Sequence, residues 1–247
     1  MTFVLLHGLG GSRAQPLSLL SPALPAGAAV HAPDVRAHGA STKIGTDFSL
    51  DTLAAELVPG LPEGPLTIMG ISMGAALALR LALRPDIEIE RLVLIRPAFT
   101  DEPSPPNLEA FPVMGELLRS KRSLPWATAE ARAERAFTRT PHYSRLIEES
   151  PRGAAGALEQ FRQRDAAARA IRLIEIPRNR AFTVAEIATV RVPATVIAAE
   201  RDPVHPVSVA ELWAESLAGP LDTVPPRDDS LERYVSATRT AVGRAIT

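Results

Sequence analysis

The chain of 247 residues is 46% hydrophobic, which suits one domain with a large core and excludes a mostly disordered protein. Its 27 Lys and Arg and 28 Asp and Glu give a net charge of −1, which argues against a dedicated nucleic-acid-binding protein. There is no cysteine, which excludes disulfides and thiolate metal sites, and the five histidines lack zinc-type spacing, so we expect no metal or other cofactor.

The N-terminal residues do not have the pattern of a signal peptide. Residues 2–6 are apolar and meet His7 and Gly8 at once, so the basic region and long hydrophobic region of a signal peptide are missing. No run reaches the roughly 18 apolar residues of a membrane span. We therefore expect a cytoplasmic protein that acts on a small-molecule substrate, away from membranes and nucleic acids. The apolar helices do not distinguish a monomer from an oligomer.

Short apolar runs alternate with helical patterns along the chain. Their nearly continuous apolar character is typical of parallel strands covered on both faces. Strands are expected at residues 2–6, 28–32, 66–70, 91–95, 194–199 and 221–224. Helices are expected at residues 14–24, 50–57, 73–83, 207–217 and 231–245. The alternation predicts an α/β fold, an open and mostly parallel six-stranded sheet with helices on both faces.

A long segment between the fourth and fifth strands breaks this alternation. Residues 100–191 contain no strong strand, and they open with a proline-rich stretch at 102–106 that resists regular structure. Helical patterns follow at 127–138 and 154–172. An inserted helical unit between two strands of an α/β sheet is interpreted as a lid, which excludes water and shapes a pocket.

The inserted segment is also the most basic part of the chain. Residues 116–180 hold 14 Arg and Lys and 8 Asp and Glu, a local net charge of +6. For most of these arginines, solvation of exposed helix faces is a sufficient explanation. We expect a helical lid at 100–191 that interrupts a core formed by residues 1–99 and 192–247.

One motif predicts a nucleophile. Residues 70–74 read Gly-Ile-Ser-Met-Gly and stand between an apolar run and a helical run. A strand, a sharp turn with Ser72 at its tip, and a helix together form a nucleophile elbow. The alternative is a structural serine in a tight turn, but further polar motifs follow the other strands. Because parallel strands end at one edge of a sheet, we expect these motifs to meet there.

The motifs in their order resemble those of the α/β-hydrolase superfamily, specifically its small esterase-like members. They are His-Gly at 7–8, Asp-x-Arg-x-His-Gly-x-Ser at 34–41, Gly-x-Ser-x-Gly at 70–74 and Asp-x-x-x-Pro at 202–206. The resemblance covers essentially the whole chain. It implies that Ser72 attacks an acyl carbonyl and that Asp202 is the acid that orients a histidine. The backbone N–H groups of Leu9 and Met73 would bind the oxyanion.

The resemblance fails at the histidine. The family places it after the last strand, but residues 224–234 contain no histidine, and the last one in the chain is His205. The implied activity is serine-dependent hydrolysis of a small carboxylic ester or thioester, with His205 as a displaced base. Two alternatives stay open: a non-hydrolytic enzyme (lyase, cyclase or isomerase) with a broken triad, and a catalytically silent ligand-binding protein.

Several of these residues also have ordinary structural explanations. Asp202 would cap a turn with Pro203, and His205 would simply line the pocket. His38 is a typical pocket residue of the family and is a substrate-binding candidate. Arg96 ends an apolar run, where a buried arginine needs a partner. It would either pair with a carboxylate such as Asp101 or bind a carboxylate of the substrate.

Overall fold

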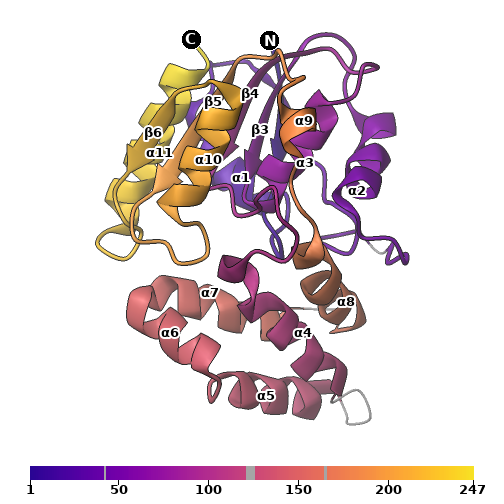
Figure 1. Ribbon diagram of the computed structural model, residues 1–247, viewed down its shortest axis with the longest axis vertical. Coiled ribbons are helices and arrows are strands. Elements are labelled where there is room, and N and C mark those ends of the chain that lie inside the picture. The colour runs from indigo at the N-terminus through magenta and orange to yellow at the C-terminus, as the bar shows by residue number, and fades with distance from the viewer. Residues whose placement is uncertain (42, 121–125, 164–165) are drawn as a thin grey trace.

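A computed structural model of the chain describes residues 1–247 except 42, 121–125 and 164–165. Six strands form one sheet in the order β2-β1-β3-β4-β5-β6 (Figure 1), and every neighbouring pair is parallel. The strands are β1 (Thr2–Leu6), β2 (Ala29–His31), β3 (Leu66–Ile71), β4 (Ile89–Ile95), β5 (Ala194–Ala199) and β6 (Leu221–Val224). This confirms the predicted open parallel sheet.

The central strands are buried because helices cover both faces of the sheet. Alternate residues of β1 point to opposite layers, so Val4 joins one core cluster while Phe3 joins the other. The first layer contains α2 (Leu50–Leu57), α3 (Met73–Ala82), α9 (Val184–Ile187) and α10 (Val207–Leu217), and the second contains α1 (Ala14–Leu20) and α11 (Leu231–Ala245). Helix α1 is shorter than predicted, because a 3₁₀ turn with Pro22 in its first turn follows Leu20.

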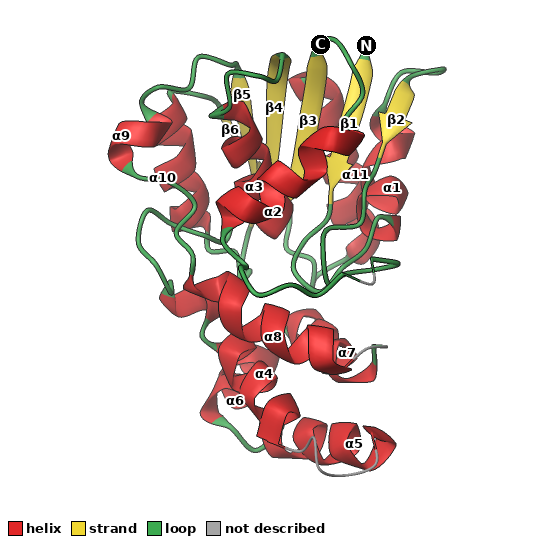
Figure 2. Ribbon diagram, turned by 90° about the vertical axis from the view of Figure 1, so that its right-hand side faces the viewer, coloured by secondary structure: helices red, strands yellow, loops and turns green. Residues whose placement is uncertain are grey.

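Five helices between β4 and β5 form a separate layer, which we call the helical insert. They are α4 (Ala110–Ser120), α5 (Trp126–Phe137), α6 (Pro141–Glu149), α7 (Pro151–Arg162) and α8 (Ala166–Glu175). They enclose a core of their own around Met114, Phe137 and Phe161. The insert lies against the end of the sheet toward which all the strands point (Figure 2).

The helical insert differs in detail from the sequence prediction. Residues 164 and 165, within the predicted helical stretch 154–172, lie outside the described residues, and α7 and α8 flank them. Helices α4 and α6 were not predicted. Helix α4 contains Pro112 and Gly115, which obscure a helical pattern. A Cβ at Gly115 would lie 2.8 Å from the Ala170 carbonyl oxygen, so glycine permits the close packing of α4 on α8.

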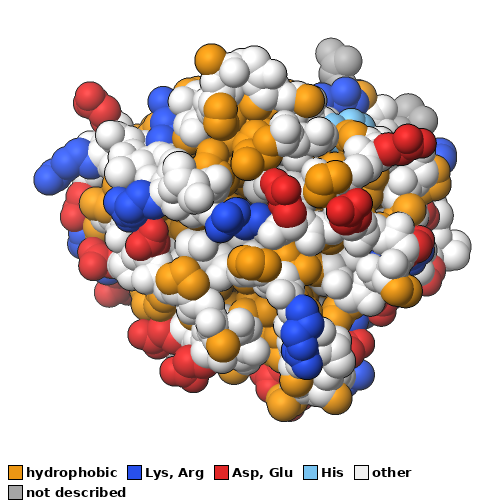
Figure 3. Space-filling view, turned by 90° about the horizontal axis from the view of Figure 1, so that it is seen from above, with side chains coloured by type: hydrophobic (Ala, Val, Ile, Leu, Met, Phe, Trp, Pro, Cys, Tyr) orange, Lys and Arg blue, Asp and Glu red, His pale blue; other side chains and the backbone are white. Residues whose placement is uncertain are grey.

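The opposite end of the molecule carries both termini (Figure 1). Seen from that side, acidic and basic side chains are interspersed over the surface (Figure 3). None of the helices in the described part of the chain is long and apolar enough to cross a membrane.

Candidate active site

Ser72 lies in a strained turn between β3 and α3. Its backbone has φ 55° and ψ −112°, a region that residues other than glycine rarely adopt. A Cβ at Gly70 would lie 2.1 Å from the Gly74 carbonyl oxygen, and one at Gly74 would lie 2.3 Å from the Leu6 carbonyl oxygen. Both glycines are thus required by close backbone approach, and the turn has the strand–serine–helix geometry that the motif predicted.

Two backbone N–H groups stand near this serine without acceptors. Met73 is the first residue of α3, where helix geometry leaves N–H groups unpaired. Leu9 follows Gly8, whose own N–H donates to Gln15 Oε1 at 2.8 Å and so fixes the loop after β1. Across the described residues, neither the Leu9 nor the Met73 N–H has a hydrogen-bond acceptor.

A cavity of about 190 Å³ lies between the strand ends and the helical insert. The sheet side contributes residues from the loops after five strands: Leu9, Ser72, Arg96, Asp202, His205 and Arg227. The insert contributes mainly apolar and small residues, among them Met114, Leu146, Gly153, Gly156 and Ala157, and also the polar Gln160. The predicted candidates Ser72, Asp202, His205, Arg96 and Leu9 therefore share one cavity.

Asp202 is held by a buried ion pair. Its Oδ2 accepts from Arg96 Nε at 2.9 Å, and its Oδ1 accepts from the backbone N–H groups of Val204 and His205, each at 3.2 Å. Burial alone would raise the Asp202 pKa, but Arg96 and His205 hold it well below its usual range. Arg96 thus pairs with Asp202 and not with Asp101, the partner considered from the sequence.

His205 has two competing neighbours at the same nitrogen. Its Nδ1 lies 3.0 Å from Asp202 Oδ1 and 2.8 Å from Arg96 Nη2. In one tautomer Nδ1–H donates to Asp202 and Nε2 is free to accept a proton; in the other Nδ1 accepts from Arg96 and Nε2 carries the hydrogen. Among the described residues, Nε2 has no hydrogen-bond partner. Burial and Arg96 lower the His205 pKa, so the imidazole is neutral at pH 7.

The match to known families follows this geometry. A family model described as the alpha/beta hydrolase fold matches residues 2–226. The chain belongs to the α/β-hydrolase fold family. The matched region begins in β1 and ends in the loop after β6, so it includes the serine turn and the Arg96–Asp202 pair.

Solved structures of other α/β hydrolases share the fold. MenH from S. aureus is 16% identical with a TM-score of 0.71, covering 100% of this chain and 95% of that one. An acetylester hydrolase from Corynebacterium glutamicum is 11% identical with a TM-score of 0.77, covering 99% and 85%. A hydrolase from Pseudomonas aeruginosa is 22% identical with a TM-score of 0.67, covering 98% and 89%. At these identities the likeness concerns the fold alone.

One curated relative is similar over part of the chain. Pimeloyl-[acyl-carrier protein] methyl ester esterase from Aromatoleum aromaticum is 39% identical over 102 residues. That stretch covers 40% of this chain and 39% of the relative, so the similarity spans about two fifths of either protein.

Two further histidines at the same edge of the sheet, His7 and His38, bond to the backbone of loops. His7 Nδ1 donates to the Gly8 carbonyl oxygen at 2.8 Å, and His7 Nε2 accepts from the Val35 N–H at 3.0 Å. Burial lowers the His7 pKa to about 4. His38 Nδ1 donates to the Arg36 carbonyl oxygen, and its ring packs 5.0 Å from that of His7.

The structure does not bring His38 together with Ser72. The turn in which the His38 N–H donates to the Val35 carbonyl oxygen directs the side chain toward His7. His38 lines a neighbouring cavity with Ser12, Ser41 and Arg172, which shares Gln15 with the Ser72 cavity but is not lined by Ser72. The substrate-binding role predicted for His38 stays a prediction.

Two lining residues of the Ser72 cavity were not singled out from the sequence. Arg227 follows β6, in the loop where the resemblance places a histidine, and its guanidinium lies 5.7 Å from the Tyr234 ring centre. Gln160 of α7 approaches Gly10 so closely that a Cβ there would lie 2.0 Å from Gln160 Oε1. Arg227 could have been found from the sequence, because it lies in the loop where the family has its histidine. No sequence pattern pointed to Gln160.

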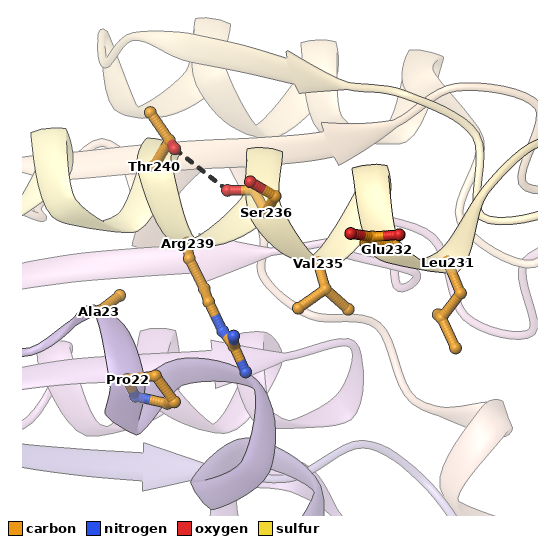
Figure 4. A pocket seen from close by; sticks show the side chains of 8 residues that line it. All are labelled: Pro22, Ala23, Leu231, Glu232, Val235, Ser236, Arg239 and Thr240. Atoms are coloured by element: carbon orange, nitrogen blue, oxygen red, sulfur yellow. Dashed lines mark hydrogen bonds between the residues drawn. The ribbon is translucent and has the colours of Figure 1, made fainter.

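A larger hollow, of about 840 Å³, lies between α11 and the turn after α1 (Figure 4). Its side chains include Val235, Leu231 and Thr240, whose hydroxyl donates to the Ser236 carbonyl oxygen. Arg239 there donates to the Ser18 and Leu19 carbonyl oxygens. The hollow combines no nucleophile with a histidine, so the Ser72 cavity is the candidate active site.

Proposed function

We propose that the protein is a serine-dependent acyl hydrolase that acts on a small carboxylic ester or thioester. One observation carries the proposal: Ser72 stands in a strained turn at a cavity, next to the unpaired N–H groups of Leu9 and Met73. The partial similarity to a methyl ester esterase supports the same reaction class.

In the proposed reaction, Ser72 Oγ attacks the acyl carbon while His205 Nε2 takes the serine proton. This step uses the tautomer in which Nδ1–H donates to Asp202. The carbonyl oxygen becomes an oxyanion that accepts from the Leu9 and Met73 N–H groups, each contributing about 3–4 kcal/mol to transition-state stabilisation. The protonated His205 then gives its proton to the leaving alkoxide or thiolate, and a water molecule repeats the attack on the acyl-Ser72 ester.

The helical insert acts in this proposal as the lid predicted for residues 100–191. Met114, Leu146 and Ala157 of the insert present apolar surface to the cavity opposite Ser72. Apolar walls keep bulk water away from the oxyanion and so strengthen its hydrogen bonds.

A second candidate function follows from Arg96. If Arg96 Nη2 donates to His205 Nδ1, then His205 Nε2 carries a hydrogen and accepts no proton from Ser72. The cavity then retains ligand binding without an activated serine. That state suits a non-hydrolytic lyase, cyclase or isomerase, or a catalytically silent ligand-binding protein.

Labelling with a fluorophosphonate serine probe distinguishes the two candidates. We expect the wild-type protein to react and Ser72→Ala to lose all labelling. His205→Gln should react about 10³-fold more slowly than the wild type. Ser236→Ala, which removes a hydroxyl on α11, is the matched control and should react like the wild type. A folded wild-type protein that does not react, or labelling that persists in Ser72→Ala, contradicts the hydrolase.

A further inference from the structure

Arg227 is a cation at the cavity whose neighbouring carboxylates are already engaged. Asp228 accepts from Ser150 Oγ at 2.6 Å and from the Arg152 N–H at 2.8 Å, at the start of α7. Asp229 forms an ion pair with Arg201. Within the described part of the chain, Arg227 donates no hydrogen bond and forms no ion pair.

The environment of Arg227 is unfavourable for a guanidinium left alone. Its Nε is enclosed without a hydrogen-bond partner. Burial and the charge of Arg96 lower the Arg227 pKa, whereas Tyr234, Asp202 and Asp228 raise it. The Tyr234 ring, 5.7 Å away, favours a cation but offers its face and no carboxylate. Asp202 and Asp228 act on its charge but form no hydrogen bond or ion pair with it among the described residues, so an anionic ligand that bonds this half-buried guanidinium directly would stabilise it.

The charge balance of the cavity points the same way. Three arginines line it, Arg96, Arg152 and Arg227, together with one carboxylate, that of Asp202. Asp202 is committed to Arg96 by a buried ion pair. The charges of Arg152 and Arg227 are therefore not balanced by carboxylates of the lining, and the cavity attracts anions.

We propose that Arg227 binds a carboxylate of the substrate, so that the preferred substrates are small esters or thioesters that also carry a free carboxylate. The inference rests on the proposed hydrolase function and adds the substrate class. The planar guanidinium fork matches a carboxylate bidentately. The cavity of about 190 Å³ is small for a ligand pocket, which favours a short-chain ligand.

The kinetic test compares two methyl esters of equal chain length, monomethyl adipate with its carboxylate and methyl hexanoate without one. We expect the wild type to prefer monomethyl adipate in kcat/KM, and Arg227→Gln to reduce that preference by about ten- to a hundredfold. Arg227→Lys keeps the positive charge but lacks the planar guanidinium, so it should retain part of the preference for monomethyl adipate. Arg201→Gln, an exposed arginine on the preceding loop, is the matched control and should keep the wild-type preference. An equal preference in wild type and Arg227→Gln overturns the proposal.

A binding test separates this inference from the hydrolase proposal. Calorimetry with Ser72→Ala measures both esters without turnover, alone and combined with Arg227→Gln. Tighter binding of monomethyl adipate that Arg227→Gln abolishes supports the carboxylate site, even where the wild type hydrolyses neither ester. Hydrolysis by the wild type with equal binding of the two esters supports the hydrolase and overturns the carboxylate site.

Discussion

Two clusters at the same edge of the sheet combine a histidine, a carboxylate and an arginine, but they use them differently. In the first, after β1 and β2, His7 is bonded through both ring nitrogens to backbone groups. Asp34 accepts from the backbone N–H groups of Arg13 and Ala40, at 2.7 and 2.9 Å, and from Arg13 Nε. These hydrogen bonds fix the loops after β1 and β2.

In the second cluster, after β4 and β5, the side chains bind one another. Arg96 and Asp202 form a buried pair, and His205 contacts both through Nδ1 alone. Its Nε2 is left for the cavity that contains Ser72. Burial lowers the pKa of both His7 and His205, so these two histidines differ not in burial but in the Nε2 atom, which is bonded in His7 and unpaired in His205 among the described residues.

The largest expected contrast is in activity. His205→Gln should lower kcat for hydrolysis of 4-nitrophenyl acetate by about 10⁴-fold, because it removes the proposed base. His7→Gln should change kcat by less than about tenfold, since its nitrogens contact only backbone. Equal losses in the two variants would remove the distinction between the clusters.

The two arginines should differ in stability. Arg96→Gln leaves the buried Asp202 carboxylate unpaired and should lower the free energy of unfolding by about 3–5 kcal/mol. Arg13→Gln breaks a pair in which the arginine side chain is 52% exposed and should cost about 1 kcal/mol or less. Urea denaturation measures both, and a similar loss in both variants contradicts the contrast.

His7 should make the fold acid-sensitive. Its folded pKa of about 4 lies below the unfolded value of 6.5, so the unfolded chain binds more protons between these values. Stability from this group is complete above pH 6.5 and falls as the pH drops toward 4, by about 3 kcal/mol in total. Urea titrations between pH 4 and pH 7 should show a weaker pH dependence in His7→Gln than in the wild type.

The smallest effect concerns the pH profile of hydrolysis. His205 must be neutral to accept a proton, and its pKa is lowered. On the acidic side, kcat/KM should therefore begin to fall only at a pH below the ordinary pKa of histidine. Arg96→Gln removes a cation that lowers this pKa, and the acidic limb should move to higher pH. An acidic limb that stays in place would mean that His205 is not the group that titrates.

The sequence predicted the sheet better than the helical insert. Strands β1, β5 and β6 and helices α2, α10 and α11 begin and end at the predicted residues, because buried strands and amphipathic helices have distinct apolar periods. Helix α6 was missed although Thr140 caps it and Pro141 opens it. Helix α9 has only four residues, too few for a helical period to be visible.

The site was predicted as a set of positions but not as a set of contacts. Ser72, Arg96 and Asp202 follow strands of a parallel sheet, and topology alone places them at one edge. Which arginine meets which carboxylate depends on side-chain directions in loops 106 residues apart, as for Arg96 and Asp202. Such pairs leave no periodic pattern in the sequence.

Adjacent residues in the loop after β6 have separate partners. Arg227 faces the cavity, while Asp228 fastens the first turn of α7 through Ser150 and the Arg152 N–H. The residue proposed to bind the ligand is thus next in sequence to the residue that attaches the insert, and Asp228 follows Arg152, whose N–H it binds, by 76 residues. A chimera that grafts this helical insert onto another sheet must also carry the loop after β6. Without that loop, the insert loses both the Asp228 contacts that attach it and the arginine proposed to bind the substrate carboxylate.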